Sequence, residues 1–165
     1  MISLIDYGAG NLTSVRKALA HLGVTATTPR APADLTSADG IIVPGVGNFA
    51  VTAELGPDWR AAILDQVGRQ RPLLGICVGM QWLFDGSEEA PGHAGLELLP
   101  GTCRLLTDET VVDERMDDST SRVEGSAGMG RFKVPHVGWN SLHLTKQSWL
   151  LDGVDEGDQV YFTHS

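Results

Sequence analysis

The amino-terminal half of the chain alternates between short apolar runs and segments whose apolar residues recur at helical spacing. The apolar runs predict buried strands at residues 2–5, 24–28, 40–43 and 72–77. The segments with helical spacing cover residues 12–22, 59–67 and 80–84. Asn11 stands where the first helix needs an N-cap, and Gly23 stands where that helix would end. Alternation of this kind is typical of a parallel sheet, so we predict an α/β fold with helices on both faces of the sheet.

The pattern changes after about residue 96, where the apolar runs become shorter. Three such runs, at residues 103–107, 134–137 and 160–162, predict short antiparallel strands. Residues 113–130 are polar and charged with little periodicity, and we predict a mobile surface loop there. No linker is long enough to divide the chain, so we expect one domain over residues 1–165.

Composition and charge exclude several classes of protein. With 165 residues, of which 42% are hydrophobic and 20% charged, the chain has the composition of a soluble globular domain. It has no apolar run near the roughly 18 residues that a membrane span needs, and it lacks the basic start of a signal peptide. We therefore expect a cytoplasmic protein without membrane contact. The 12 basic and 21 acidic residues give a net charge of −9, which argues against a nucleic acid partner.

The clearest candidate for chemistry is Cys77, one of two cysteines. The other is Cys103, and two cysteines are too few for a disulfide framework, so at least one thiol is free. Cys77 is the centre of the G-x-C-x-G motif at residues 75–79, the cysteine turn, which lies between an apolar run and a helical segment. A nucleophile on such a turn needs small residues two positions away on either side. The helix start favours a thiolate and a developing oxyanion. The alternative is a buried core cysteine, but the strand before and the helix after favour the nucleophile.

A second glycine-rich loop follows another predicted strand of the same sheet. Residues 44–47, the PGVG loop, read Pro-Gly-Val-Gly. The carboxyl ends of strands line the ligand crevice in open α/β sheets, so this loop and the cysteine turn are expected to face each other. The backbone N–H of Val46 would then be one oxyanion donor and that of Val78 the other. The alternative is a tight turn without a ligand.

Glycines also follow the first predicted strand, but they do not make a dinucleotide site. Residues 8–10 read Gly-Ala-Gly, yet Thr13 stands where a third glycine is required, and no acidic residue ends the second strand. The sequence has no Walker-type phosphate loop and no His-Glu-x-x-His motif. We therefore expect neither a cofactor nor a metal ion.

The histidines do not reveal the base that a cysteine nucleophile usually needs. The sequence contains five of them: His21, His93, His136, His143 and His164. His21 is expected on a helix surface and His93 in a loop. His136 and His143 lie in the strand region without an adjacent carboxylate. Spacing alone assigns none of them to Cys77.

Five segments, taken together, carry a resemblance to a known family. In chain order they are residues 6–11 (DYGAGN), 44–47 (PGVG), 75–81 (GICVGMQ), 135–140 (PHVGWN) and 161–165 (YFTHS). With them the chain resembles the class I (triad) glutamine amidotransferases, and among these the glutaminase subunits of imidazole glycerol phosphate synthase in histidine biosynthesis. The G-x-C-x-G motif indicates only the broad superfamily, whereas residues 44–47 and 135–140 single out these subunits.

The resemblance implies a flavodoxin-like α/β fold and hydrolysis of L-glutamine to glutamate and ammonia. Cys77 would attack the side-chain amide and form a glutamyl thioester. The N–H groups of Val46 and Val78 would be the oxyanion donors, and the loop around Val46 would have to reorient to present its N–H. The positions that match those holding the glutamine in the family are Gly47, Gln81, Glu89 and Ser165.

The resemblance also implies a partner. This is a (β/α)8 cyclase subunit, which receives the ammonia and uses it on a phosphoribulosyl-formimino nucleotide. The products would be imidazole glycerol phosphate and an aminoimidazole carboxamide ribotide. Asn11, Trp139 and Asn140 match family positions that face the partner in the heterodimer. For Trp139, burial in the core is the alternative.

Two features depart from the family pattern. Residues 113–130 are longer than the family's connection at this point. The family's Phe-His-Pro-Glu segment, which carries the base and its orienting carboxylate, follows the 161–165 motif and is not in this chain. We therefore expect an incomplete amidotransferase domain that by itself turns over no appreciable glutamine. The alternatives are a catalytically dead partner-binding subunit and a glutaminase of pyridoxal phosphate or anthranilate synthesis, although residues 135–140 argue against the latter.

Overall fold

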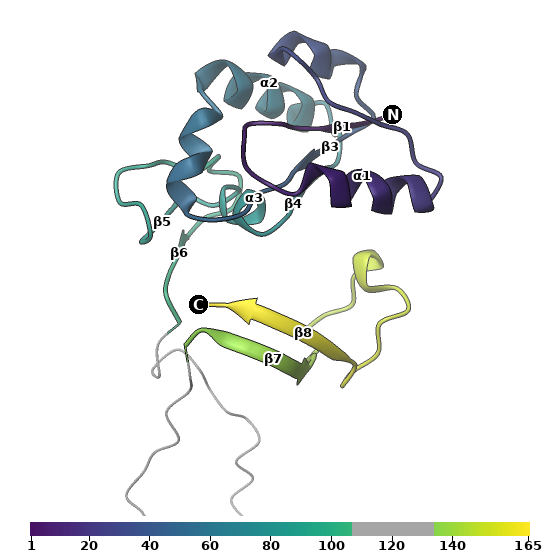
Figure 1. The fold of residues 1–165 in the computed structure, drawn as a ribbon, viewed down its shortest axis with the longest axis vertical. Coiled ribbons are helices and arrows are strands. Elements are labelled where there is room, and N and C mark those ends of the chain that lie inside the picture. Colours follow the sequence, from purple (N-terminus) through teal and green to yellow (C-terminus); the bar gives the residue numbers. More distant parts are fainter. Residues whose placement is uncertain (107–133) are drawn as a thin grey trace, which may run out of the picture. The chain divides into compact units, whose positions relative to one another are not determined.

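The computed structural model describes residues 1–106 and 134–165 of the chain. The chain forms two compact units, Met1–Arg104 and Leu105–Ser165 (Figure 1). The polar loop expected at residues 113–130 lies outside the described residues. The expectation of a single domain stays a prediction.

The first unit contains a parallel sheet of four strands. These are β1 (Ile2–Leu4), β2 (Ala26–Thr27), β3 (Gly40–Val43) and β4 (Leu73–Gly75), in the order β2-β1-β3-β4. Ile2 pairs with Gly40, and Ile41 pairs with Leu73, so β3 lies between β1 and β4. The predicted parallel sheet is confirmed, although β2 and β4 are shorter than the apolar runs that indicated them.

Helices connect these strands as the apolar spacing predicts. The α-helices are α1 (Leu12–His21), α2 (Pro57–Gly68) and α3 (Val78–Gln81), and the 3-10 helices of this unit are η1 (Pro32–Ser37) and η2 (Phe49–Glu54). The side chain of Asn11 accepts a hydrogen bond from the backbone N–H of Ser14 at 3.0 Å, which confirms the expected N-cap. Figure 1 shows α1 and α2 on opposite sides of β1 and β3.

The helix after the cysteine turn is shorter than expected. Helical spacing ran to residue 84, whereas α3 ends at Gln81. An α-helix that reached residue 84 would need the N–H groups of Leu83 and Phe84 to donate to carbonyl oxygens four residues back. They donate instead three residues back, to Met80 at 3.0 Å and to Gln81 at 3.1 Å. The chain therefore leaves α3 in tighter turns.

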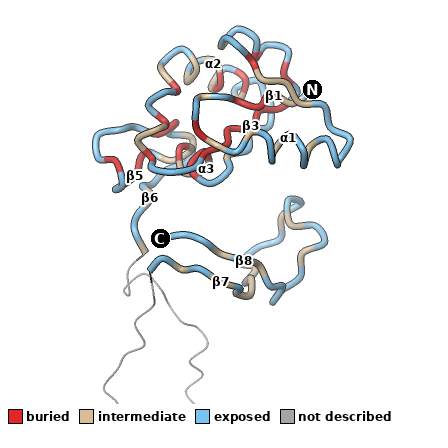
Figure 2. The backbone as a smooth tube through the Cα atoms, viewed as in Figure 1, coloured by how far each residue is buried: buried red, intermediate tan, exposed pale blue. Residues whose placement is uncertain are grey.

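The core of the first unit lies around β3. All of its residues are buried, and Val43 packs in one cluster with Ile63 of α2, Phe49 of η2 and Trp82 after α3. Figure 2 shows the buried backbone concentrated in this unit. Burial of every residue in β3 agrees with a sheet that is covered on both faces.

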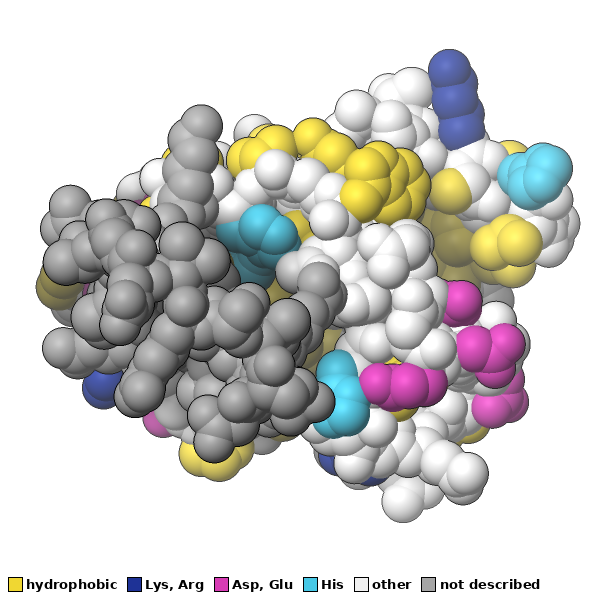
Figure 3. Space-filling model, turned by 90° about the horizontal axis from the view of Figure 1, so that it is seen from below, with side chains coloured by type: hydrophobic (Ala, Val, Ile, Leu, Met, Phe, Trp, Pro, Cys, Tyr) yellow, Lys and Arg dark blue, Asp and Glu magenta, His cyan; other side chains and the backbone are white. Residues whose placement is uncertain are grey.

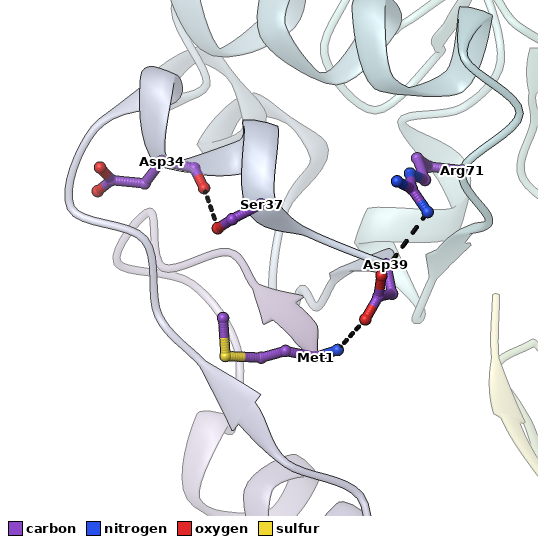
Figure 4. Close-up of polar contacts among 5 residues, drawn as sticks. All are labelled: Met1, Asp34, Ser37, Asp39 and Arg71. Carbon is purple, nitrogen blue, oxygen red and sulfur yellow. Dashed lines mark hydrogen bonds and ion pairs between the residues drawn. The ribbon is translucent and has the colours of Figure 1, made fainter.

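An ionic cluster joins the segments before β1, β3 and β4. The Asp39 carboxylate accepts a hydrogen bond from the amino group of Met1 and lies 3.6 Å from a guanidinium nitrogen of Arg71 (Figure 4). Close by, the Ser37 hydroxyl donates to the carbonyl oxygen of Asp34 at 3.1 Å. The hydrogen bond from the Met1 ammonium group, then its charge and that of Arg71, hold the pKa of Asp39 below its usual value.

A second pair of strands in this unit corrects one prediction. β5 (Gly86–Ser87) and β6 (Thr102–Cys103) run parallel, whereas the run at residues 103–107 predicted an antiparallel strand. The physical reason is the connection over residues 88–101, which is long enough for the crossover that a parallel pair needs.

The second unit is a hairpin. β7 (His136–Ser141) pairs antiparallel with β8 (Gln159–His164), and η3 (Trp149–Leu151) lies between them. This confirms the antiparallel strands expected at residues 134–137 and 160–162. None of residues 134–165 is buried (Figure 2). Figure 3 shows hydrophobic side chains open to solvent on the face that it draws. In the described part of the chain, no helix has both the length and the apolar character to cross a membrane.

Candidate active site

Cys77 lies on the turn between β4 and α3, as the motif predicts. Its backbone has φ +55° and ψ −116°, and the residue is exposed. A residue other than glycine seldom adopts a positive φ, and such strain is typical of positions where a side chain is presented for reaction. The turn thus holds the Cys77 sulfur out of the core at the carboxyl end of the sheet.

The two glycines of the cysteine turn have no room for a side chain. A Cβ atom added at Gly79 would overlap the carbonyl oxygen of Val43, and one added at Gly75 would overlap the backbone of Met80. Ile76 N–H also donates to the Val43 carbonyl oxygen at 2.9 Å. The predicted need for small residues around Cys77 is therefore confirmed.

The PGVG loop lies against the cysteine turn. A Cβ atom added at Gly45 would come within 2.7 Å of the backbone nitrogen of Gly79 and 2.8 Å of the Cβ of Val78. The parallel pairing of β3 with β4 causes this approach, because both segments leave the sheet at the same edge. The structure thus brings together the two loops that the sequence selected.

The two expected oxyanion donors both have free N–H groups. Among residues 1–106 and 134–165, neither the N–H of Val46 nor that of Val78 has a hydrogen-bond acceptor. Val78 begins α3, where an N–H has no partner within the helix, and Val46 is 55% exposed. Their role as oxyanion donors stays a prediction.

The residues expected to hold a substrate fall into two groups. Gln81 is one turn beyond Cys77, and its side-chain oxygen is buried without a hydrogen-bond partner among residues 1–106 and 134–165. A carboxylate oxygen of Glu89 accepts from the N–H of Phe49 at 2.7 Å, which places Glu89 beside the end of the PGVG loop. Gly47, at φ +91°, lies in the loop itself. Ser165 follows β8 and belongs to the second unit.

No histidine of the described residues is hydrogen-bonded to Cys77. His136 Nδ1 lies 3.0 Å from His164 Nε2, across the hairpin. His143 Nδ1 lies 2.6 Å from a carboxylate oxygen of Glu156, a partner that residue spacing did not indicate. The base for Cys77 therefore remains unassigned in this part of the chain.

Tyr7 is a residue of the site that sequence reasoning missed. Its hydroxyl donates to the carbonyl oxygen of Pro44 at 2.7 Å, at the start of the PGVG loop. Burial, and after it the charge of Cys77, raises the pKa of Tyr7 to about 12. The available signal was its position after β1, because the carboxyl ends of parallel strands meet at one edge.

The residues expected at a partner interface are exposed to different degrees. Trp139 is 70% exposed and makes an edge contact with Tyr161, with ring centroids 5.7 Å apart. Its burial in a core, the alternative for this residue, does not occur in the hairpin. Asn140 follows it, and alternation along β7 directs the two side chains to opposite faces. Asn11 is exposed at the start of α1.

Comparisons with known proteins place this chain in a family. The profile of the family "Glutamine amidotransferase class-I" matches residues 3–165. The chain is 43% identical to the "Imidazole glycerol phosphate synthase subunit HisH" of Desulfovibrio desulfuricans, over 100% of this chain and 70% of that protein. It is 41% identical to the HisH subunit of Desulfitobacterium hafniense, over 100% of this chain and 69% of that protein.

Two further likenesses agree with this. The "Imidazole glycerol phosphate synthase hisHF, chloroplastic" of Arabidopsis thaliana is 39% identical over 100% of this chain and 25% of that protein. A solved "Crystal structure of glutamine amidotransferase" is similar with a TM-score of 0.55 at 20% identity, over 64% of this chain and 57% of that one, which supports the fold alone. The chain therefore belongs to the class-I glutamine amidotransferases, and within them to the group of the imidazole glycerol phosphate synthase HisH subunits.

Proposed function

We propose that this chain is a glutaminase subunit that releases ammonia from L-glutamine for imidazole glycerol phosphate synthesis. The observation that carries the proposal is the strained, exposed Cys77, held on a turn that packs against the PGVG loop. Family membership and the names of the relatives support the same reaction. They do not favour the glutaminases of pyridoxal phosphate or anthranilate synthesis.

The reaction proceeds in two steps. The Cys77 sulfur bonds to the side-chain amide carbon, and the N–H groups of Val46 and Val78 stabilise the negative charge on the carbonyl oxygen. The C–N bond then breaks, ammonia leaves with the proton of the thiol, and a glutamyl thioester remains. Water adds to the thioester, the C–S bond breaks, and glutamate and the free thiol result.

Four residues are proposed to hold the glutamine. The Glu89 carboxylate pairs with the α-ammonium group of the substrate, since an ionised acceptor makes a strong hydrogen bond with a cation. The unpartnered oxygen of Gln81 gains a donor from the substrate, which removes the energetic penalty of a buried unpaired acceptor. Gly47 and Ser165 complete the set that the family resemblance implies.

We propose that this chain forms a cytoplasmic heterodimer with a (β/α)8 cyclase subunit. The ammonia passes to the cyclase, which consumes it in a lyase reaction. The names of the relatives support a place in that synthase. The exposed Trp139 is one contact with the cyclase, together with Asn140 and Asn11.

The test is a comparison of two nitrogen sources in the complex of the full-length subunit with the cyclase. We expect Cys77→Ala to abolish synthesis from glutamine and to leave synthesis from ammonium salts intact. Cys103→Ala is the matched control, because it removes the other free thiol, and it should leave both activities intact. Loss of both activities in Cys77→Ala would show that Cys77 is structural. Retention of both would contradict a nucleophile at Cys77.

The expectation that this chain turns over little glutamine by itself stays a prediction. Its basis is that no histidine in the described residues is hydrogen-bonded to Cys77, so the thiol proton has no evident carrier. Ammonia release measured with the 165-residue chain and the cyclase tests this expectation. Release at the rate of a complete HisH subunit would contradict it.

A further inference from the structure

The PGVG loop is fixed at its first residue and just after its last one by hydrogen bonds to residues of other segments. At the start of the loop, the Tyr7 hydroxyl donates to the carbonyl oxygen of Pro44 at 2.7 Å. Just after its end, Phe49 N–H donates to a carboxylate oxygen of Glu89 at 2.7 Å. The donor at the start follows β1, and the acceptor at the end follows β5. The loop is therefore a short span between two fixed points.

The start of this span is closely packed, whereas its middle is open. A Cβ atom added at Gly45 would lie 2.7 Å from the Tyr7 hydroxyl and 2.7 Å from the Gly79 nitrogen. A Cβ atom added at Gly47 would have nothing within 4 Å, and Val46 is 55% exposed. Freedom to reorient is thus greatest at the peptides of Val46 and Gly47.

We propose that Tyr7 is a positioning residue for the oxyanion donor of Val46. Its hydroxyl anchors the Pro44 carbonyl, so the PGVG loop can turn the Val46 peptide while its first residues stay against the cysteine turn. The inference rests on the proposed glutaminase function, because this donor is needed when a carbonyl group is attacked. Tyr7 acts through the loop and touches no reacting atom.

A partly buried tyrosine suits this role because its hydroxyl remains a donor. With a pKa raised to about 12, the group keeps its proton throughout the neutral range. Its ring packs against the core of the first unit, which fixes the direction of the hydroxyl. Phenylalanine at this position would keep the ring and remove one oxygen atom, so it tests the hydrogen bond alone.

Loss of the anchor should affect the transition state more than the thiol itself. Oxyanion stabilisation depends on a donor held in advance where negative charge develops, and small displacements weaken it strongly. The intrinsic reactivity of the Cys77 thiol does not depend on that donor. A pair of cysteine reagents can therefore separate the two effects.

The first reagent is an L-glutamine analogue in which a chloromethyl group replaces the side-chain amide nitrogen. Attack by sulfur on its ketone forms a bond to the carbonyl carbon and puts negative charge on the oxygen, and the thiol proton is lost to solvent. Sulfur then bonds to the methylene carbon as chloride leaves, and the first carbon–sulfur bond breaks as the ketone re-forms. The second is iodoacetamide, which reacts by displacement of iodide without charge on a carbonyl oxygen. The rate of each reaction at Cys77 is measured by mass spectrometry of the full chain.

We expect Tyr7→Phe to slow the reaction with the ketone about tenfold and to leave the iodoacetamide rate unchanged. Ser37→Ala is the matched control, because the Ser37 hydroxyl also donates to a backbone carbonyl, that of Asp34 at 3.1 Å (Figure 4). It should change neither rate. An unchanged ketone rate in Tyr7→Phe, or equal slowing with both reagents, would overturn the positioning role.

The wild-type chain separates failure of this inference from failure of the proposed function. If the wild-type chain reacts no faster with the L-glutamine ketone than with its D enantiomer, the glutaminase function itself is contradicted, and the role of Tyr7 falls with it. If the wild-type chain prefers the L enantiomer and Tyr7→Phe reacts equally fast, only the role of Tyr7 is wrong.

Discussion

In the first unit, strand β3 is buried along its whole length, whereas none of residues 134–165 in the second unit is buried. Both units carry motifs of the family. In the first, the conformation at Cys77 is fixed by backbone atoms in direct contact around Gly79 and Gly45. In the second, the hairpin is held by its ladder and by ring contacts such as that of Trp139 with Tyr161.

The difference shows how a strained residue can be maintained. A positive φ at Cys77 requires energy that the surrounding packing must supply, and the first unit has a core from which to supply it. The hairpin has no strained residue of this kind other than glycine among those described. Substitutions that distinguish a packed core from an open hairpin therefore test this comparison directly.

The largest effect is expected from removal of core side-chain volume. Ile63→Ala should lower the free energy of unfolding of the first unit by about 2–5 kcal/mol, because Ile63 is completely buried and its loss leaves a cavity. Leu150→Ala in η3, at a residue 66% exposed, should change the measured free energy of unfolding by less than about 0.5 kcal/mol. Urea denaturation followed by tryptophan fluorescence, to which the buried Trp82 contributes, measures both. Similar losses would contradict the contrast between the units.

A smaller effect is expected at the cysteine turn. Gly79→Ala should lower the free energy of unfolding by about 1–3 kcal/mol, because the added methyl group has to displace the carbonyl of Val43. Gly68→Ala, at the end of α2 where a Cβ would meet nothing within 4 Å, is the control and should be neutral or slightly stabilising. The same denaturation measurement applies. A neutral Gly79→Ala would refute the close packing of this turn.

In the hairpin, the expected effect is smaller and local. Trp139→Ala should weaken pairing with β8 by about 0.5–1 kcal/mol, because the edge contact with Tyr161 is lost. Amide hydrogen exchange should then be faster in β8 and unchanged in β3. Trp149→Ala, at a residue 82% exposed, is the control and should change neither. Faster exchange in β3 would contradict the local character of the contact.

The smallest effects concern pH and one carboxylate in each unit. A hydrogen bond from the Met1 ammonium group lowers the pKa of Asp39. A hydrogen bond from the Leu144 N–H lowers the pKa of Glu156. A carboxylate with a lowered pKa binds protons less readily in the folded chain than in the unfolded chain. Each therefore stabilises its unit above its unfolded pKa, about 3.9 for aspartate and 4.3 for glutamate, and the contribution is lost as pH falls through the folded pKa.

Neutral variants should reduce this dependence in one unit at a time. Asp39→Asn should make the stability of the first unit less sensitive to pH below about 4, with no change in hairpin exchange. Glu156→Gln should have the reverse pattern. Denaturation and hydrogen exchange at several pH values provide the comparison. A change in both units from either variant would count against separate local effects.

Much of the first unit could be predicted because its signals are local. β3 agrees with the predicted range, since a fully buried strand shows as an apolar run between a glycine and a proline. Cys77 could be selected because the backbone contacts at its turn exclude any side chain at Gly75 and Gly79, and such contacts leave a mark in the sequence.

The features that were missed depend on contacts between distant segments. After α3 the chain forms tighter turns, and the carbonyl oxygens of residues 83 and 84 accept hydrogen bonds from residues 98 and 97, contacts that the local sequence does not indicate. The parallel pairing of β5 with β6 is set by the path of the connection between them. Tyr7 reaches Pro44 across 37 residues of sequence, and Glu156 reaches His143 across 13. Residue spacing cannot show such pairs before the topology is known.

The central claim is that Cys77, and not Cys103, is the nucleophile of a glutamine site. Its most direct test is mass-spectrometric mapping of the wild-type chain after reaction with the chloromethyl ketone analogues of L- and D-glutamine. We expect the L form to modify Cys77 at least about ten times faster than the D form, with Cys103 unmodified, because burial raises the pKa of the Cys103 thiol. Equal rates for the two enantiomers, or equal modification of both cysteines, would contradict the claim.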